Sequence, residues 1–222
     1  MNQNPNKLFV EGHDDLRSVV GLMRHHVKWS EKKTDAPVWI EIGSGVTKIL
    51  QKEYLSTLMK DPSSKVLGVM LDADLDAGSR YDSFRKLCLD FFPTIPKTLP
   101  ESGLIVDNSD GKRLGLWIMP DNASQGAMEM FLKFLVPPTE HNGWEHAVKS
   151  TLEAKTIGCK YKECHLDKAH LYSWLAWQDE PGQSPGNALT SKILDPKSPS
   201  ATTFVNWMIA LYSLQRHEEL FV

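Results

Sequence analysis

The stretch from Lys65 to Asp76, KVLGVMLDADLD, contains an apolar run followed by three aspartates at alternate positions, and it points to an α/β fold. The residues up to Leu71 have the composition of a buried strand. Asp72, Asp74 and Asp76 follow directly, so three like charges are crowded where the strand ends. A strand with this ending calls for a partner that neutralises the charges.

The segments before and after this strand alternate between strand and helix patterns. Strands are expected at 7–11, 38–42 and 65–71, and helical spacing follows at 16–27, 46–60 and 79–91. Such alternation is typical of a Rossmann-like, mostly parallel sheet that is flanked by helices and joined by right-handed crossovers.

The pattern changes after Pro93. Strands are expected at 103–107 and 114–119 around an Asp-Gly turn, a strong hairpin signal, and a helix at 124–135. The remainder is predicted to be mainly helical, with helices near 143–155, 166–177 and 201–217 and a long loop at 179–200. We therefore expect a domain at 1–136 and a helical C-terminal extension at 137–222 that packs on it.

Composition limits the class of protein. The 222 residues are 41% hydrophobic and 24% charged, as in ordinary globular proteins. The net charge of −3 argues against a generally basic nucleic-acid binder but allows a local basic groove. Three cysteines argue against a disulfide framework. No apolar stretch approaches the roughly 20 residues that span a bilayer, and the N-terminus is not signal-like, so we expect a cytoplasmic protein without a membrane partner.

Acidic residues follow the first and the third predicted strands. Glu11 ends the first strand, and Asp72 and Asp74 end the third. Functional groups in an open parallel sheet gather beyond the carboxyl ends of its strands, so these carboxylates should face one crevice. Hard divalent cations such as Mg²⁺ prefer carboxylate oxygens. The sequence therefore predicts a metal site, with ordinary turn and capping chemistry as the alternative.

These residues resemble the Toprim domain, the metal-binding α/β module of topoisomerases, bacterial primases and OLD-family nucleases. The likeness rests on Val10-Glu11-Gly12 with Asp14 and Asp15, followed some sixty residues later by the strand that ends in Asp72-Ala73-Asp74, and it covers about residues 7–135. The stretches WIMPDN at 117–122 and GAME at 126–129 are similar to an uncharacterised bacterial family of stand-alone Toprim proteins related to the OLD-family nucleases.

The resemblance implies a Mg²⁺- or Mn²⁺-dependent nuclease that acts on DNA or RNA, with a role in defence against phage. It implies that the catalytic residues are Glu11, Asp72 and Asp74. It implies metal ligation by Glu11, Asp15, Asp72, Asp74, Asp76 and Glu129. Ser124 and Glu129 are the closest counterparts of a serine and a glutamate that help to bind a second metal in OLD-like nucleases.

Cationic groups are needed to stabilise a phosphoryl-transfer transition state. Those expected near the crevice are Lys48, Arg80, Lys112 and Arg113, and together with Ser124 they are the predicted substrate-binding residues. Plain surface charge is the alternative for each cation. The start of the C-terminal extension is basic because it contains Lys155, Lys160, Lys162 and Lys168. These lysines could bind a nucleic-acid backbone, or they could form a solvated helical face.

Other motifs carry weaker signals. Gly43-Ser44-Gly45 is a tight turn that could touch a ligand. His13 lies beside the acidic residues and could relay protons. A zinc site could be formed by Cys159, Cys164, His165 and His170, although their spacing is loose for zinc. The simpler interpretation is that a cysteine is buried and the histidines are exposed.

Two other functions remain open. One is a non-catalytic module that binds a metal and a nucleotide, or whose extension docks a partner protein or forms a homodimer. The other is a metal-dependent enzyme that acts on a small phosphorylated substrate.

Overall fold

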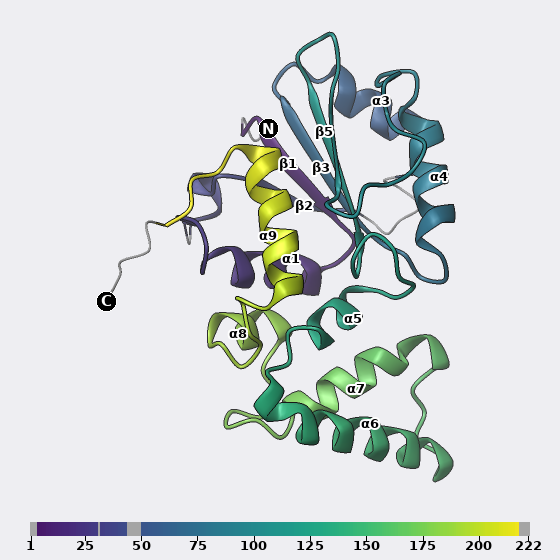
Figure 1. Cartoon of the computed structure of the whole chain (residues 1–222), viewed down its shortest axis with the longest axis vertical. Helices are drawn as coiled ribbons and strands as arrows, with labels where there is room; N and C mark the ends of the chain where they lie inside the picture. Colours follow the sequence, from purple (N-terminus) through teal and green to yellow (C-terminus); the bar gives the residue numbers. More distant parts are fainter. Residues whose placement is uncertain (1–3, 31, 44–49, 218–222) are drawn as a thin grey trace.

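The computed structural model describes residues 4–30, 32–43 and 50–217, and it shows a mixed α/β fold around a five-stranded sheet (Figure 1). The strand order is β2-β1-β3-β5-β4, and only β4 runs antiparallel to its neighbour. The strands are β1 Asn6–Val10, β2 Trp39–Ile42, β3 Val66–Asp72, β4 Leu104–Asp107 and β5 Arg113–Met119. The predicted mostly parallel sheet flanked by helices is therefore confirmed.

Helices cover both faces of this sheet. The helices of the described residues are α1 His13–Met23, α3 Lys52–Lys60, α4 Ala77–Cys88, α5 Met128–Lys133, α6 His141–Thr156, α7 Leu166–Leu175, α8 Pro185–Thr190 and α9 Pro199–Tyr212. In Figure 1, α3 and α4 lie on one side of the sheet, and α1 and α9 lie on the other. No helix in the described part of the chain is long and apolar enough to cross a membrane.

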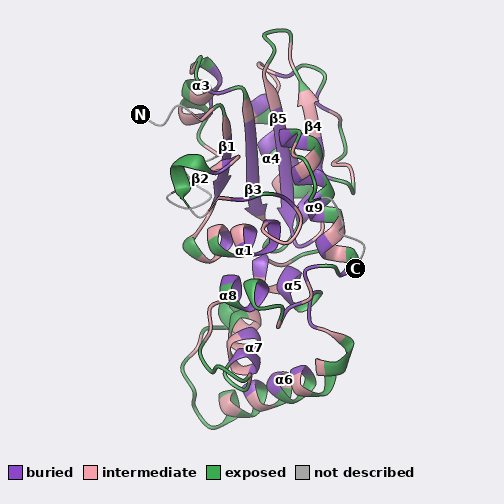
Figure 2. Ribbon diagram, turned by 90° about the vertical axis from the view of Figure 1, so that its left-hand side faces the viewer, coloured by how far each residue is buried: buried purple, intermediate pink, exposed green. Residues whose placement is uncertain are grey.

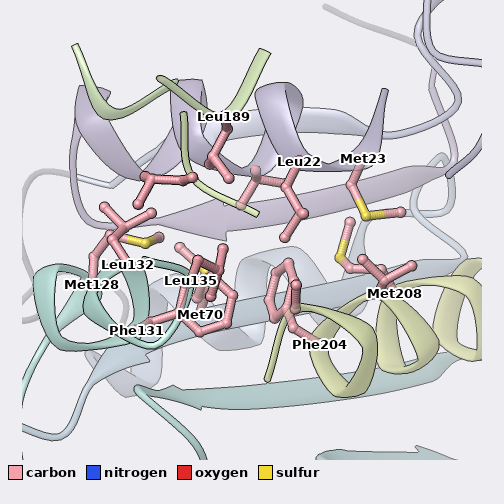
Figure 3. Close-up of a cluster of buried hydrophobic side chains, with 14 of the residues drawn as sticks. Leu22, Met23, Met70, Met128, Phe131, Leu132, Leu135, Leu189, Phe204 and Met208 are labelled. Carbon is pink, nitrogen blue, oxygen red and sulfur yellow. The ribbon is translucent and has the colours of Figure 1, made fainter. Parts of the chain in front are cut away.

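The strands divide their side chains between two apolar clusters. On β3, Met70 faces the helices α1, α5 and α9, whereas Val69 and Leu71 face α4. On β5, Trp117 belongs to the same cluster as Met70, and Ile118 belongs to the cluster of Val69 and Leu71. Figure 3 shows the first cluster, and Figure 2 shows that the central strands are buried. Because these strands are buried on both faces, their sequences are continuous apolar runs and do not alternate between apolar and polar residues.

The C-terminal helix α9 lies directly against the sheet. Tyr212 Oη donates a hydrogen bond to the carbonyl of Lys7 at 2.9 Å, and Trp207 Nε1 donates one to the carbonyl of Leu104 at 3.0 Å. The contact is close because Gly68 lacks a side chain, and a Cβ there would lie 2.1 Å from Tyr212 Oη. The predicted extension thus supplies part of the layer that covers one face of the sheet.

Two predicted elements end or begin elsewhere because of local backbone geometry. The helix expected at 124–135 begins only at Met128, since Gly126 has φ +126° and pairs with Asp74 in an isolated β-bridge. The helix expected to reach residue 217 ends at Tyr212, because Ser213 adopts the left-handed conformation with φ +54°.

The long loop predicted at 179–200 contains the short helix α8. Ser184 caps this helix by accepting a hydrogen bond from the amide of Asn187, and Pro185 occupies its first position. The helix packs closely on α1, where a Cβ on Gly186 would lie 2.6 Å from the carbonyl oxygen of Arg17. Tertiary packing therefore stabilises a helix too short to form alone.

Helices α6 and α7 form a helical hairpin that lies beyond the carboxyl end of the sheet (Figure 1). Trp144 of α6 and Trp174 of α7 pack together with ring centroids 6.0 Å apart. Helix α7 also contacts α5. This position places one face of the hairpin beside the ends of β1 and β3.

Candidate functional site

A hollow of about 350 Å³ lies beyond the carboxyl ends of β1 and β3. Its walls carry five acidic side chains, which are Glu11, Asp14, Asp15, Asp72 and Glu129, together with Lys168 of α7. We call these five the acidic cluster. Four separate elements contribute to it, so it exists only in the folded chain.

The parallel pairing of β1 with β3 brings the first two carboxylates together. Glu11 follows the last residue of β1, and Asp72 is the last residue of β3. The amide of Asp72 donates a hydrogen bond to Glu11 Oε1 at 2.9 Å. The amide of Met128, the first residue of α5, donates to Asp72 Oδ1 at 3.1 Å. These bonds fix both side chains against the backbone.

Asp15 enters the cluster from the first turn of α1. Its Oδ2 accepts a hydrogen bond from the amide of Gly12 at 2.8 Å, so the carboxylate also caps the helix. Only 8% of Asp15 is exposed. Capping explains the aspartate at this position, whereas burial beside other acids is more than a cap requires.

Burial and mutual repulsion raise the pKa values of the cluster. Burial raises the pKa of Asp72 to about 8, and the charges of Glu11, Asp15 and Glu129 add to this effect. Burial likewise raises the pKa of Asp15 to about 6 and raises that of Glu11. The cluster is thus electrostatically unfavourable when fully ionised, and protons or a cation relieve the repulsion.

Asp14 and Glu129 meet a cation at the rim. Lys168 Nζ lies 3.3 Å from Asp14 Oδ2 and 3.8 Å from Glu129 Oε1. Tyr172 Oη donates a hydrogen bond to the same oxygen of Asp14 at 3.0 Å. Helix α7 thus contributes one positive charge and one hydroxyl to the site.

The donor set fits a hard divalent cation, because carboxylate oxygens are the ligands that Mg²⁺ and Mn²⁺ prefer. Within residues 4–30, 32–43 and 50–217, however, no group of three or more His, Cys, Asp or Glu side chains is already arranged to hold a metal ion. Asp72 Oδ1 and Glu11 Oε1 are instead hydrogen-bonded to amides. An ionised carboxylate offers about four acceptor sites, so each side chain can keep its amide bond and still offer oxygen to a cation.

Two predicted ligands have other partners. Asp74 is well exposed and pairs with Arg80, while its backbone pairs with Gly126. Asp76 is the N-cap of α4, where it accepts a hydrogen bond from the amide of Ser79. Of the three aspartates in the opening stretch, only Asp72 lines the acidic hollow.

Arg80 is the predicted cation that the structure brings to the site. Its Nε donates a hydrogen bond to the carbonyl of Asp72 at 3.0 Å, and its guanidinium pairs with Asp74. Ser124 lies in the loop before α5, where its hydroxyl donates to Asp121 Oδ2 at 2.8 Å. Lys48 lies outside the described residues, as do Ser44 and Gly45 of the predicted turn.

The placement of Lys112 and Arg113 near the crevice is wrong. Arg113 opposes Val66 at the start of β3, and it pairs with Asp107 at 2.8 Å. Six residues of extended strand separate it from the end of β5, roughly 20 Å at about 3.3 Å per residue. Lys112 Nζ donates to the carbonyl of Asp61 at 2.7 Å at that same far end. Both residues stabilise the hairpin end of the sheet.

Sequence reasoning missed Tyr172 and treated Lys168 only as part of a basic segment. Both lie more than 150 residues from their partner Asp14 along the chain. Their spacing of four residues on one helix is the only local signal, and it does not identify a partner. His13 does line the acidic hollow. Cys159 and Cys164 are exposed.

Comparisons with known proteins give a family but no function. The family described as "Protein of unknown function (DUF3226)" matches residues 5–213. No curated protein and no solved structure matches the chain. The match includes the sheet, the acidic cluster and the α6–α7 hairpin together.

Proposed function

The chain belongs to the DUF3226 family, and we propose that it is a Toprim-like protein whose acidic cluster binds Mg²⁺ or Mn²⁺ for phosphoryl transfer on nucleic acid. The observation that carries this proposal is the environment of Asp72. Burial, together with the charges of Glu11, Asp15, Glu129 and Asp74, raises its pKa to about 8. A bound cation would offset this repulsion in place of a proton, and perturbed carboxylates in a hollow are typical of functional sites.

Glu11, Asp15, Asp72 and Glu129 would hold the cation. Bound there, it would polarise a phosphodiester and lower the pKa of a water molecule. Arg80 holds the carbonyl of Asp72 and pairs with Asp74, so it fixes the loop that follows β3. Lys168 places a positive charge at the rim, where a phosphate group approaching the hollow would meet it.

Cleavage assays with matched variants test this proposal. Purified protein with Mn²⁺ is expected to degrade DNA or RNA, and Asp72→Asn and Glu11→Gln are each expected to reduce the rate at least a hundredfold, about 2.7 kcal/mol of transition-state stabilisation. Asp90→Asn is the control, because Asp90 is an exposed aspartate that pairs with Lys52 on another surface. If Asp72→Asn cleaved nucleic acid as fast as the wild type, the assignment of the active site to the acidic cluster would be wrong.

One observation favours a second candidate, a metal- and nucleotide-binding module without catalysis. Lys168 already contacts two of the acids, and no metal-binding group is pre-arranged within the described residues. For such a module, Mn²⁺ raises the melting temperature through linked binding, while no nucleic acid is cut under any condition. The two candidates are therefore separated by measuring metal binding and cleavage on the same samples.

A further inference from the structure

Three hollows follow one another along α5. The acidic hollow shares Glu129 with a second hollow of about 130 Å³. The second hollow shares Lys133, Trp144 and Val148 with a third of about 530 Å³. We call this series the α5 groove. It runs from the acidic cluster, past α5, to the face of α6 that carries Trp144, Val148 and Leu152.

The chemistry of the groove changes along its length. The third hollow has apolar walls from Val136, Trp144, Val148 and Leu152, and Leu152 is 48% exposed. Its charged side chains are Lys133, Lys149 and Glu145. Lys133 has no ion-pair partner among the described residues, and the exposed Lys149 reaches only Glu153, at 3.9 Å. The lysines outnumber the glutamate beside this apolar wall, so the hollow suits a ligand with an aromatic body and negative charges.

The middle of the groove contains a buried polar group without a partner. His170 is only 8% exposed and lines the second hollow. Its Nε2 is buried and makes no hydrogen bond within the part of the chain that the structure describes. Its Nδ1 lies 3.9 Å from Asp167. A buried ring nitrogen is costly to leave unpaired, so His170 indicates where a ligand donates or accepts a hydrogen bond.

We propose that the α5 groove binds a short single-stranded segment of nucleic acid that leads away from the phosphate held at the acidic cluster. This inference rests on the proposed function. Lys133 and Lys149 contact backbone phosphates, His170 bonds to a base or sugar, and a base lies against the apolar wall of the third hollow. Single-strand sites commonly combine such a cationic track with an apolar or aromatic surface for the bases.

The dimensions of the groove favour a single strand over a duplex. The two larger hollows, of about 350 and 530 Å³, have the size of sites for single small molecules. The bases of a duplex are stacked and paired, so a base reaches an apolar hollow only after it is flipped out at an energetic cost. A single strand places its bases there without that cost.

Fluorescence anisotropy with a labelled single-stranded oligonucleotide tests the groove, with Ca²⁺ in place of Mn²⁺ to slow cleavage. The double variant Lys133→Met with Lys149→Met is expected to bind roughly tenfold more weakly, and the slope of log K against log salt should fall by about 1.4 for two lost phosphate contacts. His170→Phe is expected to weaken binding with no change in the salt slope. The matched control is Lys52→Met with Lys60→Met on α3, which covers the other face of the sheet.

The results separate this inference from the proposed function. Groove variants that keep the Mn²⁺-dependent rise in melting temperature but lose the oligonucleotide support the groove. If the groove variants bind the oligonucleotide as tightly as the wild type, the proposed single-strand site is wrong, whereas the proposed metal site is unaffected. Equal or tighter binding of a duplex, no binding by the wild type, or equal competition by a poly-glutamate peptide also overturns it. The metal site itself fails if Mn²⁺ neither raises the melting temperature nor supports cleavage.

Discussion

At the scale of single residues, the site depends on carboxylates that the fold buries next to one another. Asp72 illustrates the effect, because one oxygen accepts a backbone hydrogen bond and the side chain still has a pKa raised to about 8. The hydrogen bond is outweighed by burial and by the neighbouring acids. The charge state of Asp72 therefore reports on the whole cluster.

Replacing Asp72 with asparagine should change how stability depends on pH. A carboxyl group whose pKa is raised from about 3.9 in the unfolded chain stabilises the fold below that value, and this contribution is lost as the pH rises toward 8. Without metal, the wild type should lose melting temperature from pH 5 to pH 8.5. Asp72→Asn should show a flatter profile and melt higher at pH 8.5, by roughly 2–4 °C for each kcal/mol of repulsion removed.

Differential scanning calorimetry in EDTA measures this profile. Asp90→Asn serves as the control, since Asp90 is exposed and pairs with Lys52. Parallel profiles for the wild type and Asp72→Asn would show that Asp72 is not under electrostatic strain.

Gly115 tests the close contact between the sheet and α9. A Cβ at Gly115 would lie 2.4 Å from Leu211 Cδ2, so Gly115→Ala should lower the free energy of unfolding by about 1–3 kcal/mol through overpacking. Gly143→Ala is the control, because a Cβ there meets only ordinary contacts at 3.6 Å and a helical alanine is preferred. Urea denaturation measures both, and equal stability of the two variants would contradict the packing described.

At the scale of elements, helix ends are decided by caps and by local backbone conformation. Helix α9 begins at a proline that follows the cap Ser198, and it ends where Ser213 turns left-handed. Helix α5 is shortened by the bridge between Asp74 and Gly126. Apolar spacing predicts that these helices exist, whereas caps and bridges set their lengths.

The cap of α9 should contribute measurably to stability. Ser198 is 7% exposed, and its Oγ accepts a hydrogen bond from the amide of Ala201 at 3.2 Å. Ser198→Ala should reduce the free energy of unfolding by about 1 kcal/mol, and Ser198→Asp should restore most of it, since aspartate is also a good cap. The midpoint of urea unfolding provides the measurement. An alanine variant as stable as the wild type would show that the cap is dispensable.

At the scale of the whole molecule, the α6–α7 hairpin completes the site from a distance. It makes polar contacts with α1 through Lys168 and Tyr172, which both reach Asp14. Its contacts with α5 create the second and third hollows. The hairpin is therefore both a wall of the α5 groove and a source of charge for the acidic cluster.

Loss of the Tyr172 hydroxyl should loosen the hairpin without unfolding the sheet. Tyr172→Phe removes a hydrogen bond of 3.0 Å to Asp14, which is worth about 0.5–1.5 kcal/mol at a half-buried position. Amide hydrogen exchange should become faster in α7 while β3 and β5 keep their protection. Tyr161→Phe, within the hairpin, is the comparison, because Tyr161 bonds to Thr151 and not to α1. Faster exchange in β3 would instead indicate global destabilisation.

The sequence by itself determined the succession of strands and helices along the chain apart from α8, the class of the sheet and the edge at which Glu11 and Asp72 meet. These follow from local periodicity and from the rule that parallel strands end at one edge. Only the tertiary structure decided that Asp74 and Asp76 turn to other partners, that Lys112 and Arg113 lie at the opposite end, and that Lys168 comes to the site. Side-chain contacts between residues far apart in the chain depend on packing and helix orientation, which local patterns do not contain.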